Sequence, residues 1–291
     1  MATVNVTRSP GFGRLPDVHT VARSSWVERC ARLGYGAKGV VYAIIGTLAL
    51  RLALGEGGRT TDSQGALRSI AEQPFGKVLL ALLAVGLVGF VVWRWVQAFM
   101  DPEHVGRRGK GLAKRLLYFG SGAIYAGLAV TAVQLALGNP QRGGHGTRHW
   151  TAKLLDQPLG QVLVALVGVG VIAYAVKEFR NAYTTHFRQK LDLRRLDPRR
   201  AHTAVQLSRF GIVSRGVVFL LMGGFFLLAA LKSDPGQAKG IGETLAMLAR
   251  QPHGALLLGL TAAGLLAYAL YLFIEARYRR IHRAAQVQSN T

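Results

Sequence analysis

Six uninterrupted apolar runs, each of about twenty residues, dominate this sequence. A helix rises about 1.5 Å per residue, so roughly twenty apolar residues cross the ~30 Å hydrocarbon core of a bilayer. The runs are apolar on all sides, whereas a helix at the surface of a soluble protein carries a polar stripe. We therefore predict an all-α, polytopic membrane protein with six transmembrane helices. The predicted spans are Gly34–Leu54, Gly76–Phe99, Leu116–Leu137, Leu159–Phe179, Phe210–Leu231 and Gly254–Phe273.

Basic residues are concentrated in every second connection between these runs. The chain has 36 Lys and Arg against 14 Asp and Glu, a formal net charge of +22. The two tails and the second and fourth connections hold 23 of the basic residues, and the other connections hold nine. Loops rich in Lys and Arg stay inside, so we expect a bacterial plasma-membrane protein with both termini cytoplasmic. Its expected partners are the bilayer and anionic headgroups rather than nucleic acid, and the sequence identifies no protein partner.

The tetrapeptide Gln-Pro-x-Gly occurs three times, each time where an even-numbered span begins. A glycine recurs ten residues after each copy, and an aromatic residue four positions beyond that glycine. We therefore predict three tandem copies of a two-helix unit. The repeated residues are Gln73, Pro74, Gly76 and Gly86; Gln157, Pro158, Gly160 and Gly170; and Gln251, Pro252, Gly254 and Gly264.

Each residue type in the repeat has a structural reason. Proline lacks an N–H group, which suits the first turn of a helix, and the glutamine side chain can bond to backbone groups left unpaired there. The mid-span glycines allow another helix backbone to approach closely, so we predict that they lie in helix–helix contacts. In the first outer connection, residues 62–72 show the spacing of a short amphipathic helix resting on the outer surface.

The repeats divide the chain into segments that all run in the same direction. Each unit returns the chain to the cytoplasm, so the three copies are related by an axis along the membrane normal. We predict a pseudo-threefold bundle of six helices, and a linear row of units is the alternative. The predicted segments are a tail over 1–25, repeats over 26–103, 111–188 and 202–278, a basic linker over 189–201, and a tail over 279–291.

Four charged residues within or near the spans are candidate functional residues: Lys38, Arg94, Glu178 and Arg215. Ionisable groups are costly in hydrocarbon, so their presence there often marks a function. Most of them lie within about two turns of a predicted helix end, where a long side chain can reach the interface. We favour this interpretation for Arg94, and an Arg94–Glu178 pair across the bundle is the alternative.

The segment from Arg32 to Tyr42 (RLGYGAKGVVY), together with the repeated Gln-Pro-x-Gly, resembles the bacterial family known as domain of unknown function 1206, found mainly in actinobacteria. The resemblance covers approximately Trp26 to Tyr278. It implies three two-helix repeats, but no activity, cofactor or site residues.

The residues themselves therefore carry what the sequence indicates about function. The sequence has no zinc-protease, nucleophile-elbow or phosphate-loop motif, so we expect no enzyme, no cofactor and no metal site. The scarcity of polar residues in mid-span favours a structural membrane component or one that interacts with a partner or lipid. The alternative is a transporter or binding protein for a small solute or lipid, with a cavity on the pseudo-threefold axis.

Overall fold

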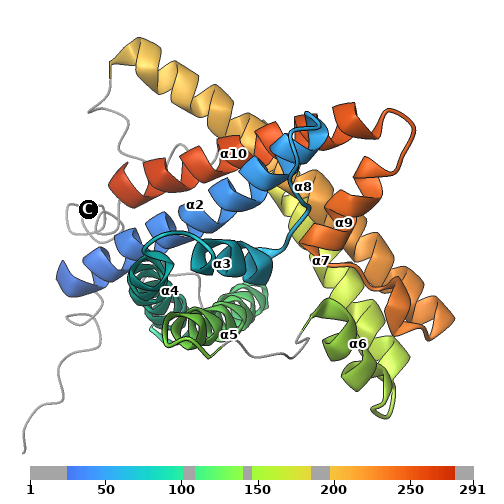
Figure 1. Cartoon of the computed structure of the whole chain (residues 1–291). Helices are drawn as coiled ribbons and strands as arrows, with labels where there is room; N and C mark the ends of the chain where they lie inside the picture. The colour runs from blue at the N-terminus through green and yellow to red at the C-terminus, as the bar shows by residue number, and fades with distance from the viewer. Residues whose placement is uncertain (1–24, 101–108, 140–145, 185–196, 279–291) are drawn as a thin grey trace, which may run out of the picture.

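The computed structural model describes residues 25–100, 109–139, 146–184 and 197–278 (Figure 1). Every element in these ranges is a helix, and six helices are long and apolar enough to cross a membrane. The chain is thus a multi-pass helical membrane protein, as predicted. Apart from Ser25, both predicted tails lie outside the described residues, as does most of the linker 189–201. The long helices are α2 (Ser25–Ala53), α4 (Gly76–Phe99), α5 (Lys110–Ala136), α7 (Gly160–Tyr183), α8 (Pro198–Lys232) and α10 (Gly254–Tyr278).

Short helices precede α4, α7 and α10. They are α3 (Ser63–Ala71), α6 (Thr147–Leu155) and α9 (Ile241–Ala249), with a 3₁₀ turn, η3 (Pro235–Gln237), before α9. The Asp62 carboxylate begins α3 by accepting a hydrogen bond from the Gly65 N–H at 2.8 Å. An ion pair of 3.0 Å between Arg148 and Glu243 joins α6 to α9. Before η3, the pKa of Asp234 is lowered because its carboxylate accepts from the Gln237 side chain and a backbone N–H.

The Gln-Pro-x-Gly motif forms a tight turn rather than the first turn of a helix. The glycine N–H donates to the glutamine carbonyl at 2.8–2.9 Å in all three copies. The residue between proline and glycine is left-handed each time: Phe75, Leu159 and His253 have φ of 62°, 63° and 62°. A positive φ directly after a proline in the second position is typical of a type II turn. The helix therefore begins at the glycine. We predicted that the glutamine side chain would cap the helix, but the structure uses the glutamine backbone carbonyl, which accepts the hydrogen bond of the turn.

The glycine of this motif is required by a close approach. A Cβ on Gly76 would collide with the backbone carbonyl of Ile70, at the end of the preceding short helix. Gly160 and Gly254 meet the carbonyls of Leu154 and Ala249 in the same way. The turn thus folds each short helix tightly back against the start of the following span.

Five of the six spans are longer than the hydropathy predicts, and the largest extensions are at the starts of α2 and α8. α2 begins nine residues before Gly34, and α8 begins twelve residues before Phe210. Asp197 starts α8 by accepting from the Arg199 N–H at 3.3 Å, with Pro198 in the first turn. Hydropathy detects only the part of a helix that lies in hydrocarbon, so polar extensions at the interface are missed.

The long helices pack in one cyclic order that is broken at a single place among the described residues. α2 packs against α4, α4 against α5, α7 against α8, α8 against α10, and α10 against α2. Closure of the ring would need an extended contact between α5 and α7, the two helices of the second repeat, and the described residues form none. Figure 1 shows the pairs α4–α5 and α7–α8 on different sides of the α2–α10 pair.

The three interfaces between successive repeats are equivalent. In each interface, a glycine of the first long helix of one repeat lies under an aromatic ring of the second long helix of the repeat before it in the ring, the third repeat preceding the first. A Cβ on this glycine would come within 2.5–2.9 Å of the aromatic ring. The pairs are Gly39 with Phe273, Gly122 with Trp95, and Gly216 with Phe179. The predicted pseudo-threefold order is therefore present, interrupted inside the second repeat.

Candidate functional site

Charged side chains gather where α2, α7, α8 and α10 meet. Lys38, Arg215 and Glu275 are each 5% exposed, and Glu178 is 8% exposed. Ionised groups are costly in an apolar interior unless they are paired or hydrogen-bonded. We call these four residues, together with Arg94, the charge cluster.

Arg215 on α8 contacts groups from other helices through its Nε and Nη1 atoms. Its Nε donates to the Tyr42 hydroxyl at 3.1 Å, and its Nη1 donates to the Tyr174 hydroxyl at 3.1 Å and to Glu178 Oε2 at 3.3 Å. The guanidinium carbon also lies 4.5 Å from the ring centre of Phe219. Guanidinium groups combine hydrogen bonding with stacking on aromatic faces, so this arginine is held by α2 and α7 as well as by its own helix.

Lys38 on α2 has a different environment. Its ammonium nitrogen lies 5.3 Å from the ring centres of both Phe90 and Tyr125, 5.9 Å from that of Tyr268 and 6.0 Å from that of Tyr42. Within the described residues, no hydrogen bond or ion pair reaches this nitrogen. Lys38 is therefore a buried cation in an aromatic cage, with donors that no protein group of the described ranges accepts.

Arg94 lies at the edge of this arrangement and is half-buried. Its Nη1 donates to Gln97 Oε1 at 3.0 Å, and its guanidinium carbon lies 4.8 Å from the Phe90 ring centre and 5.3 Å from that of Tyr118. The ion pair of Glu178 is made with Arg215.

The structure brings the candidate charges together instead of leaving them at helix ends. We expected most of these side chains to extend toward the membrane–water interface. Lys38 and Arg215 are instead buried, so this expectation does not describe them. Their long side chains turn inward because tyrosine rings and hydroxyls offer contacts there. From the sequence, the aromatic residues were recognised only as recurring positions of the repeat, and their role around the cations was missed.

A signal for this cluster is present in the repeat register. Lys38, Ser121 and Arg215 occupy the same position of the three odd spans, and Arg94 and Glu178 share a position of the even spans. An aromatic residue follows the first position by one helical turn in every repeat, so cation and ring lie on one face. Polar residues at matching register positions thus point to one place in the fold.

The mid-span glycines differ between repeats. A Cβ on Gly86 would lie 2.7 Å from the Ala37 Cβ, and one on Gly264 would collide with Ser214. Around Gly170 the structure leaves open space, and the same holds for Gly120, its counterpart on α5. The predicted packing role therefore describes the first and third repeats and fails in the second, where the two helices stand apart.

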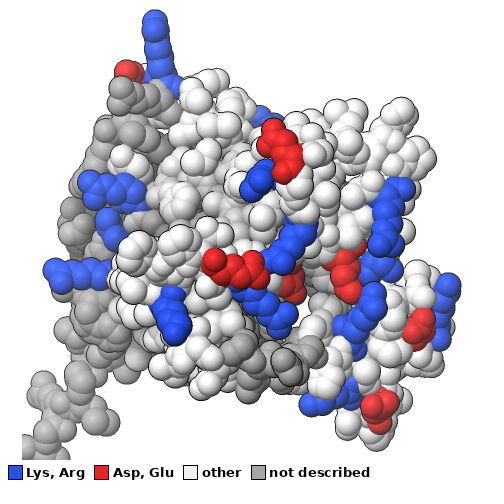
Figure 2. All heavy atoms as spheres, in the orientation of Figure 1, with Lys and Arg blue, Asp and Glu red and all other residues white. Residues whose placement is uncertain are grey.

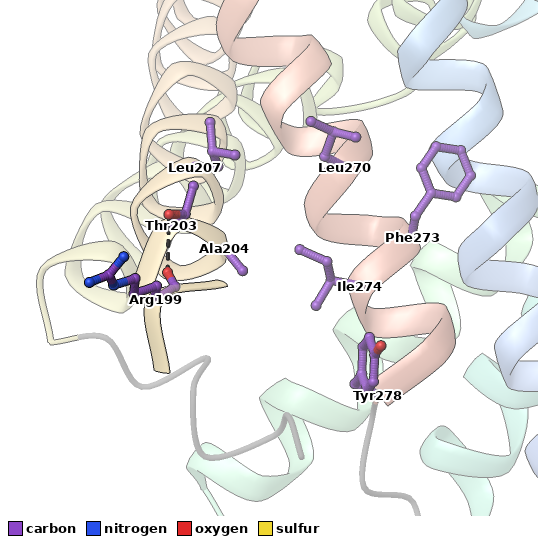
Figure 3. A pocket seen from close by; sticks show the side chains of 8 residues that line it. All are labelled: Arg199, Thr203, Ala204, Leu207, Leu270, Phe273, Ile274 and Tyr278. Carbon is purple, nitrogen blue, oxygen red and sulfur yellow. Dashed lines mark hydrogen bonds between the residues drawn. The ribbon is translucent and has the colours of Figure 1, made fainter. Parts of the chain in front are cut away.

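A separate groove of about 550 Å³ lies between the start of α8 and the end of α10 (Figure 3). Its walls include Leu207, Leu270 and Phe273, with Arg199 and Tyr278 at one end. None of the residues that line the groove belongs to the charge cluster. The groove is therefore distinct from the cluster.

Comparisons with known proteins agree with the repeated architecture. Residues 33–101, 116–185 and 210–279 each match the family described as Domain of Unknown Function (DUF1206). The chain is similar to the uncharacterized protein YxxB of Bacillus subtilis (strain 168), with 34% identity over 256 residues that cover 88% of this chain and 92% of that protein. No solved structure matches the chain. With three matching repeats over most of its length, the chain belongs to the DUF1206 family of membrane proteins of unknown function.

Proposed function

We propose that this protein binds an anionic ligand inside the membrane, with Lys38 as the residue that meets the ligand's charge. Loss of hydration destabilises a buried ammonium group unless it finds an acceptor. Aromatic rings recover about 0.5–2 kcal/mol of this, but a ring face is a poor substitute for oxygen acceptors of three N–H donors. The caged, unaccepted ammonium of Lys38 is the observation that carries the proposal.

The balance of charge in the cluster supports an anion. When all its members are ionised, three cations (Lys38, Arg94 and Arg215) face two carboxylates (Glu178 and Glu275). One anionic oxygen group would neutralise the excess charge. Arg215 already donates to Glu178 and to two tyrosines, whereas none of the three N–H donors of Lys38 has an acceptor among the described residues.

This role corresponds to the binding or transport alternative rather than to a purely structural component. The scarcity of polar residues in mid-span favoured a structural component. The few polar residues that are present nevertheless lie close together, as polar residues do at substrate sites in membrane proteins. We propose binding without catalysis, since the cluster as described holds no nucleophile next to a general base.

We further propose that the protein lies in the bacterial plasma membrane with both termini in the cytoplasm. In Figure 2, Lys and Arg stand largely without acidic neighbours on the left, the side toward which α2 begins and α10 ends in Figure 1. Acidic side chains accompany the basic ones over the centre and right of the view. Basic helix ends at the cytoplasmic face would contact anionic headgroups.

Ligand-induced shifts of the melting temperature in detergent test the site, with oleate and inorganic phosphate as probes. A ligand that binds only the folded state raises the melting temperature, and the stabilisation grows with the logarithm of ligand concentration divided by Kd. Lys38→Met keeps an apolar stem of similar length and removes the charge, so we expect it to weaken binding of the responsive probe by about tenfold or more.

The control is Lys77→Met, because Lys77 is an exposed lysine at the outer end of α4. This variant should respond to each probe as the wild type does. Circular dichroism and monodisperse elution establish that both variants are folded. Equal affinity in wild type and Lys38→Met, or no response of the wild type to either probe, would overturn the proposal.

A further inference from the structure

The second repeat leaves an apolar face uncovered on both of its helices. Val41 and Val218, at one register position of repeats one and three, are each 1% exposed, whereas Ile124 at the same position of α5 is 74% exposed. On α7, Gly170 has open space where Gly86 and Gly264 have close neighbours. We call these two uncovered faces of α5 and α7 together the α5–α7 gap.

A single side chain explains why this repeat does not close. In repeat one, a Cβ on Gly34 would lie 2.6 Å from the backbone of Phe90, and in repeat three one on Gly211 would collide with the backbone of Tyr268. The equivalent residue of the second repeat is Leu117, which is 53% exposed. A leucine cannot occupy a place where even a Cβ clashes with backbone, so α5 and α7 are barred from the packing of the other two repeats.

The gap borders the charge cluster. Ser121 on α5 stands at the register position of Lys38 and Arg215, so the third site of the pseudo-symmetric set carries a small side chain instead of a long cation. Tyr125 on α5 and Tyr174 on α7 are both half-buried. The Tyr125 ring packs over the Lys38 ammonium, and the Tyr174 hydroxyl accepts from Arg215.

We infer, resting on the proposed anion site, that the ligand is a membrane amphiphile with one acyl chain and an anionic headgroup. The headgroup would meet Lys38 beside Ser121, and the chain would lie in the α5–α7 gap against Leu117, Ile124 and Gly170. Charge complementarity places the anion, and the continuity of an apolar gap with the cluster places the tail. A water-soluble anion would make no use of the gap.

A photoactivatable oleate that carries a diazirine on its chain tests the inference. In the wild type, crosslinks should map to residues 110–136 and 160–183, because the gap is formed by faces of these two helices. Lys38→Met should lose most of this labelling, since the headgroup has lost its partner. Labelling concentrated on α8 and α10 around the groove of Figure 3 would overturn the inference.

Filling the gap provides an independent measurement. The double variant Gly120→Leu/Gly170→Leu adds side chains where the structure has open space, so it should fold and yet weaken oleate binding by about tenfold. Gly224→Leu is the matched control, because Gly224 is also exposed with open space around it, but on α8. It should bind oleate as the wild type does.

The outcomes separate the inference from the proposed function. If Lys38→Met abolishes oleate binding and the double variant does not, the anion site stands and the place of the tail is refuted. A phosphate response that depends on Lys38, without any oleate response, leads to the same conclusion. Dimers that the double variant abolishes would assign the gap to a second copy of the chain and overturn the inference.

Discussion

Lys38 and Arg215 show how one register position can serve two different purposes. Both are buried cations on equivalent faces of odd spans, and both lie among tyrosine rings. Arg215 is matched by Glu178 and by two hydroxyls, so its donors stabilise the packing of α7 and α2 against α8. Lys38 has no such partner within the described residues. The proposed ligand would supply the partner that Lys38 lacks, and this difference between the two cations can be measured as stability.

Methionine substitutions should therefore change stability in opposite directions. Lys38→Met removes a desolvated charge and should raise the free energy of unfolding by about 1–3 kcal/mol in the absence of ligand. Arg215→Met leaves the Glu178 carboxylate buried without its partner and should lower it by about 3–5 kcal/mol. Unfolding in a denaturing detergent, followed by circular dichroism, measures both. A loss of stability in Lys38→Met comparable to that in Arg215→Met would mean that the lysine is a structural residue.

At the scale of helices, repeats with similar sequences pack differently because of a few small residues. Gly34 and Gly211 let the paired helices of their repeats approach, and Leu117 prevents it. The short helices, by contrast, are folded back in the same way in all three repeats, because the glycine of each Gln-Pro-x-Gly turn meets a backbone carbonyl. Equivalent motifs thus fix the connections, while single side chains decide whether two spans touch.

The mid-span glycines give a direct test of this difference. Gly86→Leu and Gly264→Leu should each lower the free energy of unfolding by about 1–3 kcal/mol, because the new side chain meets the facing helix. Gly170→Leu should leave it nearly unchanged, since open space surrounds that position. The same unfolding assay in detergent compares the three. Equal losses for all three would show that α5 and α7 are packed together in the folded protein.

For the whole molecule, the sequence predicts the features that depend on local pattern. Span number and the three repeats follow from hydropathy and period, and α4 has the predicted bounds of Gly76 and Phe99. The starts of α2 and α8 are missed because helix continues into polar sequence where hydropathy falls. The aromatic cage of Lys38 and the break beside Leu117 depend on which helices become neighbours. The sequence pattern predicts which face of a helix a residue lies on, but the residues that this face contacts are known only from the packed structure.

Orientation is a property of the whole chain, and the distribution of charge predicts it. Basic residues near the ends of spans resist transfer across the membrane, so the segments rich in Lys and Arg, including both tails, should remain cytoplasmic. Green fluorescent protein fused after Thr291 should then fluoresce, and alkaline phosphatase at the same position should be inactive, since it folds only outside. The reverse pattern would invert the topology and would place Lys38, six residues beyond Arg32 and about 9 Å along the helix, in the outer leaflet. An amphiphile would then reach the charge cluster from that leaflet, so the fusion experiment also decides from which side of the bilayer the proposed ligand is drawn.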